Sequence, residues 1–100
     1  MSKGQTVSQQ KYGLPPELDL LAAEALKEKL VDYLHQEVGL VVDGSEVERI
    51  STPCIEVLFA AGTAFKEAEQ PFQIINSSQY LNDALEALGL NDHFQSWRAS

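Results

Sequence analysis

The sequence has few of the residues that would build a disulfide scaffold or a metal centre. It contains one cysteine, Cys54, and two histidines, His35 and His93. A single cysteine cannot form an internal disulfide, and neither histidine stands in an HxxH, HExxH or CxxC spacing with another ligand. We therefore expect no metal and no cofactor, and we interpret Cys54 as a small buried apolar residue.

Positive charge is also scarce. Seven basic residues face fifteen acidic ones, which gives a net charge of −8. A surface of this sign repels phosphate backbones and anionic lipid headgroups, so it argues against nucleic acid as a partner. No apolar run approaches the roughly 18 residues of a membrane span, and the first ten residues lack the apolar core of a signal peptide. We predict a cytoplasmic protein without direct membrane insertion.

Glycine-rich phosphate loops and acid–base pairs are missing as well. The sequence contains neither GxxxxGK[ST] nor GxGxxG. Glu24 and Glu28 are four residues apart, but Lys27 and Lys29 alternate with them, which is typical of a solvated helix face. The sequence therefore predicts a protein that is not an enzyme.

Apolar residues are present in alternating helix and strand spacings. From about Leu20 to His35 they recur at helical spacing, and the predicted buried stripe includes Leu20. Residues 39–43 are predicted to form a central, parallel strand that is buried on both faces. A second helix has Thr52 at its N-cap and Pro53 at its first position.

The second half of the chain repeats this alternation. Residues 72–75 predict another strand, residues 76–78 cap a third helix, and Gly89 follows as its C′ residue. Phe94 and Trp97 lie in a last short turn and can pack back on the body. We predict one α/β domain over residues 14–97, with a small mostly parallel or mixed sheet and about four helices, preceded by a flexible or edge-strand segment at residues 1–13.

The segment from Val47 to Leu58 carries the clearest functional signal. It places the hydroxyls of Ser51 and Thr52 at a loop-to-helix junction, where unpaired N–H groups and the helix dipole favour negative charge. A phosphate there would be partly stabilised. A plain N-cap role for Thr52, which stabilises by about 1 kcal/mol, explains the same pattern without regulation.

The same stretch resembles a known family signature. Residues 50–58, ISTPCIEVL, resemble the STAS (anti-sigma-factor antagonist) motif, in which an apolar residue, Asp, Ser or Thr, two small residues and an apolar residue open the second long helix. Leu18-Asp19 resembles the family's earlier Leu-Asp element, and residues 77–94, with their LGL and Phe94, resemble its closing helix and tail. The resemblance spans roughly residues 14–94 and implies a STAS-type domain that binds other proteins.

The resemblance also implies site residues. Thr52 falls on the position that partner serine/threonine kinases phosphorylate, and Ser51 is the second choice. The implied partner-binding residues surround it: Asp19, Asp43, Ser51, Thr52, Pro53 and Glu56. The sequence departs from the family at three positions, because Ser51 replaces the usual Asp, Pro53 lacks an N–H and Cys54 replaces the usual Gly. A phosphate on Thr52 would therefore find fewer donors.

The resemblance implies an anti-sigma factor antagonist-like regulator whose partner is an anti-sigma factor kinase. Two related functions stay open: a STAS subunit that supports the ATPase of a lipid-transport ABC complex, and an adaptor for a chemotaxis or two-component histidine kinase. Other classes are a small enzyme or ligand sensor built on Cys54, Thr52 and Asp19, and a structural dimer formed through Phe94 and Trp97.

Overall fold

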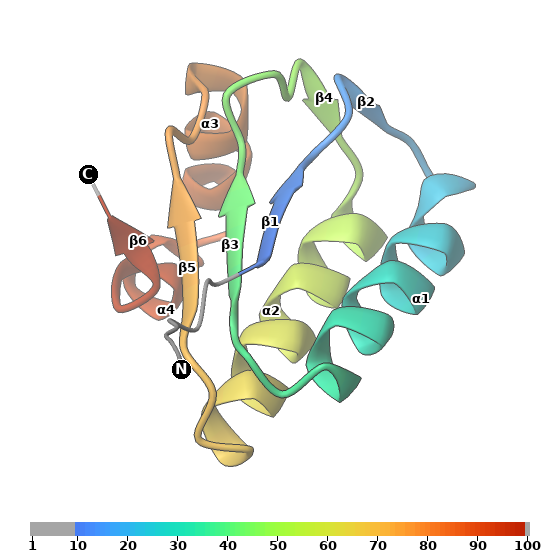
Figure 1. The fold of residues 1–100 in the computed structure, drawn as a ribbon. Helices are drawn as coiled ribbons and strands as arrows, with labels where there is room; N and C mark the ends of the chain where they lie inside the picture. The colour runs from blue at the N-terminus through green and yellow to red at the C-terminus, as the bar shows by residue number, and fades with distance from the viewer. Residues whose placement is uncertain (1–9, 100) are drawn as a thin grey trace.

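A four-stranded sheet forms the frame of the molecule in the computed structural model, which describes residues 10–99 (Figure 1). Its order is β1-β3-β5-β6, and every neighbouring pair is parallel. A second, two-stranded parallel sheet pairs β2 with β4. The strands are β1 (Gln10–Gly13), β2 (Glu17–Leu18), β3 (Leu40–Asp43), β4 (Arg49–Ile50), β5 (Phe72–Ile75) and β6 (Arg98–Ala99).

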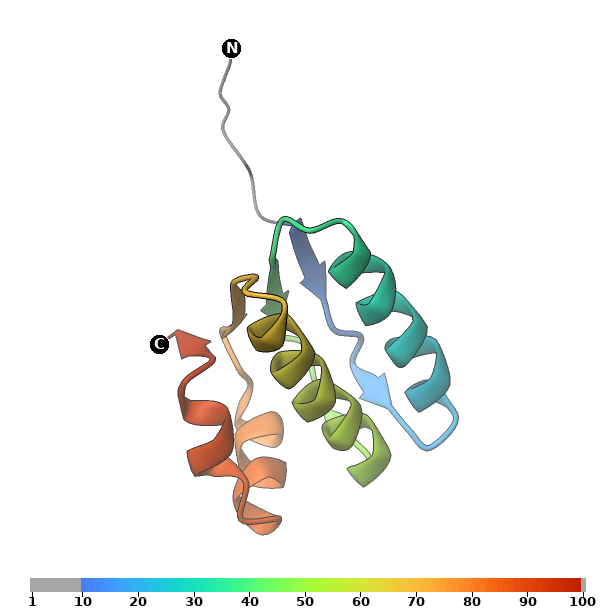
Figure 2. The same cartoon turned by 90° about the horizontal axis from the view of Figure 1, so that it is seen from below.

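Four helices complete the part of the fold that the structure describes. They are α1 (Ala22–His35), α2 (Thr52–Glu67), α3 (Gln79–Ala87) and α4 (Asn91–Gln95). The two long helices lie side by side against one face of the four-stranded sheet, and α3 and α4 lie beyond α2 at the β5–β6 end (Figure 2). The prediction of one α/β domain with a small parallel sheet and about four helices is confirmed.

The predicted N-terminal segment is only partly described. Residues 1–9 lie outside the described residues, and residues 10–13 form the edge strand β1. The domain boundary at residue 14 stays a prediction.

Strand β3 occupies the predicted central position, between β1 and β5. Leu40 and Val42 are completely buried, whereas Val41 and Asp43 are only half-buried. The prediction that both faces of this strand are buried is therefore wrong. The reason is that the long helices cover one face of the sheet, so alternate side chains point away from the core (Figure 2).

Helix α1 begins two residues later than the sequence predicts. The Asp19 carboxylate accepts hydrogen bonds from the N–H groups of Leu21 and Ala22, at 3.0 and 3.1 Å, and so stabilises a turn ahead of the helix. Leu20 lies in that turn and is 69% exposed. Its predicted place in the buried stripe is wrong, and the stripe starts at Ala22 and Ala23, which pack partly buried against the core.

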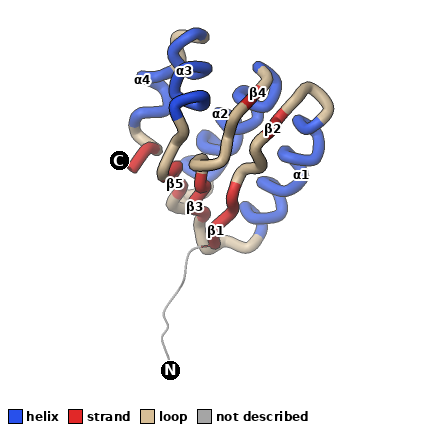
Figure 3. The backbone as a smooth tube through the Cα atoms, turned by 90° about the horizontal axis from the view of Figure 1, so that it is seen from above, coloured by secondary structure: helices blue, strands red, loops and turns tan. Residues whose placement is uncertain are grey.

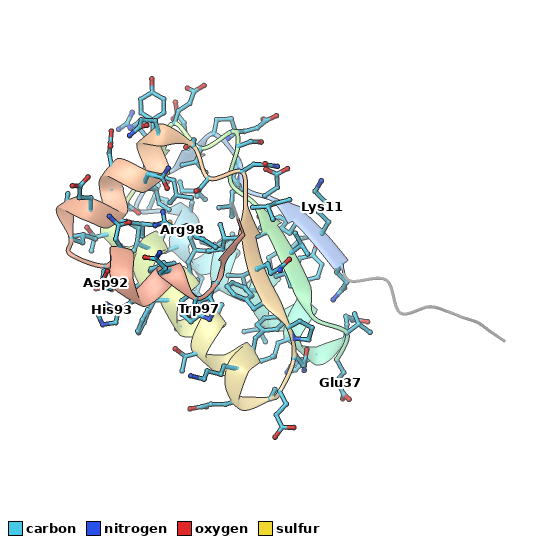
Figure 4. All side chains as sticks on the ribbon, turned by 90° about the vertical axis from the view of Figure 1, so that its left-hand side faces the viewer. Lys11, Glu37, Asp92, His93, Trp97 and Arg98 are labelled. Atoms are coloured by element: carbon cyan, nitrogen blue, oxygen red, sulfur yellow. The ribbon has the colours of Figure 1, made fainter. Side chains whose placement is uncertain are left out.

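The C-terminal residues close the core as predicted. Phe94 is completely buried, and its ring meets that of Trp97 edge-on at 5.2 Å. Trp97 points toward α2, where it lies over Gly62 (Figure 4). Gly89, at φ +69°, ends α3 in the left-handed conformation that its predicted C′ role requires, and its N–H donates to the carbonyl of Glu86.

Candidate functional site

The predicted site lies at the end of the molecule to which the parallel strands point. The loops that leave β3 and β5, the short strands β2 and β4, and the first turns of α1 and α2 gather there (Figures 1 and 3). In parallel α/β sheets this carboxyl edge is the usual position of binding surfaces, because successive loops converge on it.

Backbone and thiol hydrogen bonds hold the start of α2 against the loop that follows β2. The N–H of Ser51 donates to the carbonyl of Leu18 at 2.8 Å, and the Cys54 thiol donates to the carbonyl of Asp19 at 3.4 Å. Cys54 is completely buried, as the sequence indicates. Among the described residues, the buried hydroxyl oxygen of Ser51 has no hydrogen-bond partner.

The N-cap of α2 is Ser51, so the prediction of Thr52 at that position is wrong. Ser51 has an extended backbone (φ −83°, ψ 158°), and its carbonyl accepts the N–H of Ile55 at 3.1 Å, which closes the first helical turn one residue earlier than predicted. Its side chain makes no cap hydrogen bond. Thr52 is the first helical residue and Pro53 the second, and the side chain of Thr52 is exposed.

Two leucines beside this helix end are the functional candidates that the sequence analysis missed. Leu20 is 69% and Leu21 88% exposed, in the turn that the Asp19 carboxylate stabilises. They border a shallow notch of about 420 Å³, whose lining also includes Leu18, Arg49, Ile50 and Ser51. We call Leu20, Leu21 and this notch the leucine patch. The available signal was Asp19, a residue type that favours caps and turns just ahead of a helix.

Asp43 makes its contacts at a different part of the same edge. Its carboxylate accepts the N–H of Ser45 at 2.9 Å and forms an ion pair with Lys11 at 3.7 Å. The hydrogen bonds from Ser45, with a smaller contribution from Lys11, lower the pKa of Asp43. The loop that it orders is joined to the start of α3, because Ser78 donates through its N–H to Gly44 and through its hydroxyl to the carbonyl of Val47.

The predicted site residues therefore fall into three groups. Asp19, Ser51 and Thr52 gather around the first turn of α2. Pro53 and Glu56 follow on the side of α2 that faces α1, where they line a groove between the two helices. Asp43 is bound instead to the loop that leads toward α3.

The first turn of α2 has few of the features of a catalytic centre. The Cys54 thiol is buried and donates to a backbone carbonyl, while the Asp19 carboxylate accepts two backbone N–H groups. Within residues 10–99, no three His, Cys, Asp or Glu side chains are grouped as metal ligands. The arrangement offers an exposed hydroxyl, two exposed leucines and a notch, which suit contact with another macromolecule.

Comparison with known proteins gives the family. Residues 5–96 match the family model described as "Mlab, STAS domain". The chain belongs to the STAS family. A solved STAS structure, that of an anti-sigma-factor antagonist (STAS) domain protein from Planctomyces limnophilus, is 19% identical with a TM-score of 0.67. The match covers 85% of this chain and 73% of that one, and at this identity it shows the shared fold. No curated protein matches the chain.

STAS domains are generally interaction modules that bind protein partners and have no enzymatic activity. Segment 50–58, which carried the resemblance, lies within the matched residues and opens α2 as the resemblance implies. None of the helices described between residues 10 and 99 is long and apolar enough to cross a membrane.

Proposed function

We propose that this STAS domain is a cytoplasmic, non-enzymatic regulator that binds a protein partner through the leucine patch and the first turn of α2. The observation that carries this proposal is the exposure of Leu20 and Leu21 at a notch that Ser51, the chain neighbour of the exposed Thr52, also lines. Exposed leucines cost solvation free energy in the free protein, and a partner that covers both would recover it.

Thr52 is the proposed switch within this surface, with Ser51 as second choice. Thr52 is exposed and so accessible to a kinase, whereas the hydroxyl oxygen of Ser51 is buried. A phosphate would add a charge of about −1.5 to −2 next to the leucine patch. An apolar interface would remove water from that charge at a large cost in free energy. Phosphorylation would therefore release the partner.

The proposed partner is an anti-sigma factor that is also a serine/threonine kinase. A second candidate is the ATPase of a lipid-transport ABC complex or a histidine kinase, for which this domain would be a constitutive subunit. Pro53 favours that alternative, because it removes one backbone N–H from the helix end that would receive the phosphate.

Thr52→Glu is expected to weaken partner binding about tenfold or more, because it places a negative charge in the contact surface. Thermal stability should hardly change, since Thr52 is exposed and makes no cap bond. Thr63→Glu is the matched control, because Thr63 is an exposed threonine on the same helix. Pull-down from native extract with the wild type and both variants, followed by mass spectrometry of the bound proteins and of residue 52 in the wild type, measures the effect. Equal recovery on all three baits and no phosphate on Thr52 of the wild type would support the constitutive subunit.

Leu21→Ser is expected to reduce binding of the same partner about tenfold, because a largely exposed leucine contributes its burial only in the complex. The control is Leu88→Ser, which alters another exposed leucine, at the C-cap of α3 and outside the lining of the notch. Surface plasmon resonance with the recovered partner compares the two. If both substitutions leave the affinity unchanged, the leucine patch is not the contact surface.

A further inference from the structure

A second surface lies along the side of the molecule, between α1 and α2. The groove there has a volume of about 440 Å³ and is open to solvent. Its floor is made largely of small or short side chains, among them Ala23, Val57, Ala60 and Ala64, and Val31 on its α1 side is 38% exposed. Small side chains let the backbone of another molecule approach closely. The groove therefore suits a helix or a strand more than a loop.

The dimensions of the groove fit one helix. Its lining runs along α2 from Pro53 to Phe65, which at 1.5 Å per residue is about 18 Å, or a little over three helical turns. An α-helix about 10 Å wide would cover such a strip. A strip of this length and width amounts to roughly 200 Å², well below the about 800 Å² per partner of a typical stable interface between folded proteins. The groove is therefore too small to hold a second copy of this chain by itself, and the net charge of −8 also opposes self-association.

The charges at the groove indicate the sign of its occupant. Glu24 and Glu56 line the end nearest the first turn of α2, and Lys27 lies between that end and Val31. Among the described residues the one ion pair is Lys11 with Asp43, so both glutamates are free to pair with an incoming cation. An occupant with basic residues next to its apolar stripe would complement them and the acidic chain as a whole.

We propose that the α1–α2 groove binds an amphipathic α-helix of a partner protein, with its apolar stripe on the alanines and basic side chains against Glu24 and Glu56. This is the helix-in-groove mode of recognition. The groove shares no lining residue with the notch of the leucine patch, so the domain has two contact faces, which meet at the first turn of α2.

The test uses the full chain labelled with 15N and two synthetic 18-residue amphipathic peptides that share a leucine–alanine face. One carries lysine on its flanks and the other glutamate. The lysine peptide is expected to shift the amides of Val31, Ala60 and Ala64 and to bind about tenfold tighter than the glutamate peptide. Ala60→Glu should weaken its binding about tenfold, because Ala60 is an exposed part of the floor. Ala25→Glu, on an exposed position of α1 that does not line the groove, should have no effect.

A further variant tests the charges without altering the floor. Glu24→Lys combined with Glu56→Lys should reverse the preference, so that the glutamate peptide binds tighter. Leu21→Ser should leave peptide binding unchanged, which separates this proposal from the one for the leucine patch. Equal affinity for the two peptides, or amide shifts away from α1 and α2, would overturn the proposal. Self-association of the wild type in sedimentation that Ala60→Glu abolishes would also overturn it, because the occupant would then be a second copy.

Discussion

Replacing Phe94 with alanine is expected to lower the free energy of unfolding by about 3–5 kcal/mol, the usual cost of removing a buried phenylalanine ring. The side chain is completely buried, and its ring lies 5.2 Å from that of Trp97 and 6.0 Å from that of Phe59. Its loss would leave a cavity between α2 and α4. A domain of this size has about 5–15 kcal/mol of stability in total, so the variant would be close to unfolding at physiological temperature.

Urea unfolding followed by circular dichroism measures the effect of Phe94→Ala. Leu88→Ala is the control, because Leu88 is 43% exposed and its truncation removes little buried surface. A loss below about 1 kcal/mol for Phe94→Ala would mean that α4 and the C-terminal strand contribute little to the core.

Gly62→Ala is the second change with a large expected effect. A Cβ atom at this position would lie 2.5 Å from two carbons of the Trp97 indole, so the ring must leave its place. In most helices Gly→Ala stabilises by about 0.5–1 kcal/mol. Here the displaced ring would lose its contacts with Phe59 and Phe72, and we expect a net loss of about 1–3 kcal/mol.

Trp97 is the single tryptophan of the chain, so its fluorescence reports the displacement directly. The emission of Gly62→Ala should shift to longer wavelength, as the indole becomes more exposed to water, and its urea midpoint should fall. Gly13→Ala is the control, because a Cβ there has no heavy atom within 4 Å. An unchanged emission spectrum for Gly62→Ala would show that the ring adapts without leaving α2.

The central strands of the fold could be predicted because each is long enough to form a recognisable apolar run. Residues 72–75 form β5 as predicted, and residues 40–43 form β3, since each is a short apolar run bounded by turn residues. The paired strands β2 and β4 have two residues each, too few for any periodicity, and were not predicted. The last strand, Arg98–Ala99, is equally short and pairs only with the end of β5.

The candidate site was predictable in position but not in detail. The sequence located the first turn of α2, because capping residues and Pro53 mark a helix start. It did not show that Leu20 and Leu21 are exposed. A pattern of apolar spacing assigns the leucines of a helix to its buried face, whatever the local turn does. Their exposure depends on the Asp19 carboxylate, which bonds two N–H groups and delays the helix until Ala22. The groove between α1 and α2 depends on tertiary packing, which a single sequence does not specify.

The strand order also determines how the chain can begin to fold. In the structure of residues 10–99 every strand pair is parallel, and the β1–β3 and β3–β5 registers join residues about 30 apart, Gln10 with Leu40 and Leu40 with Phe72. No hairpin can therefore nucleate the sheet, and the entropy of closing a long loop is lost before each of these pairings forms. A helix must form between each of these strands and the next for the loop to become compact. During synthesis, the central strand β3 acquires its second neighbour only after all of α2 has emerged from the ribosome.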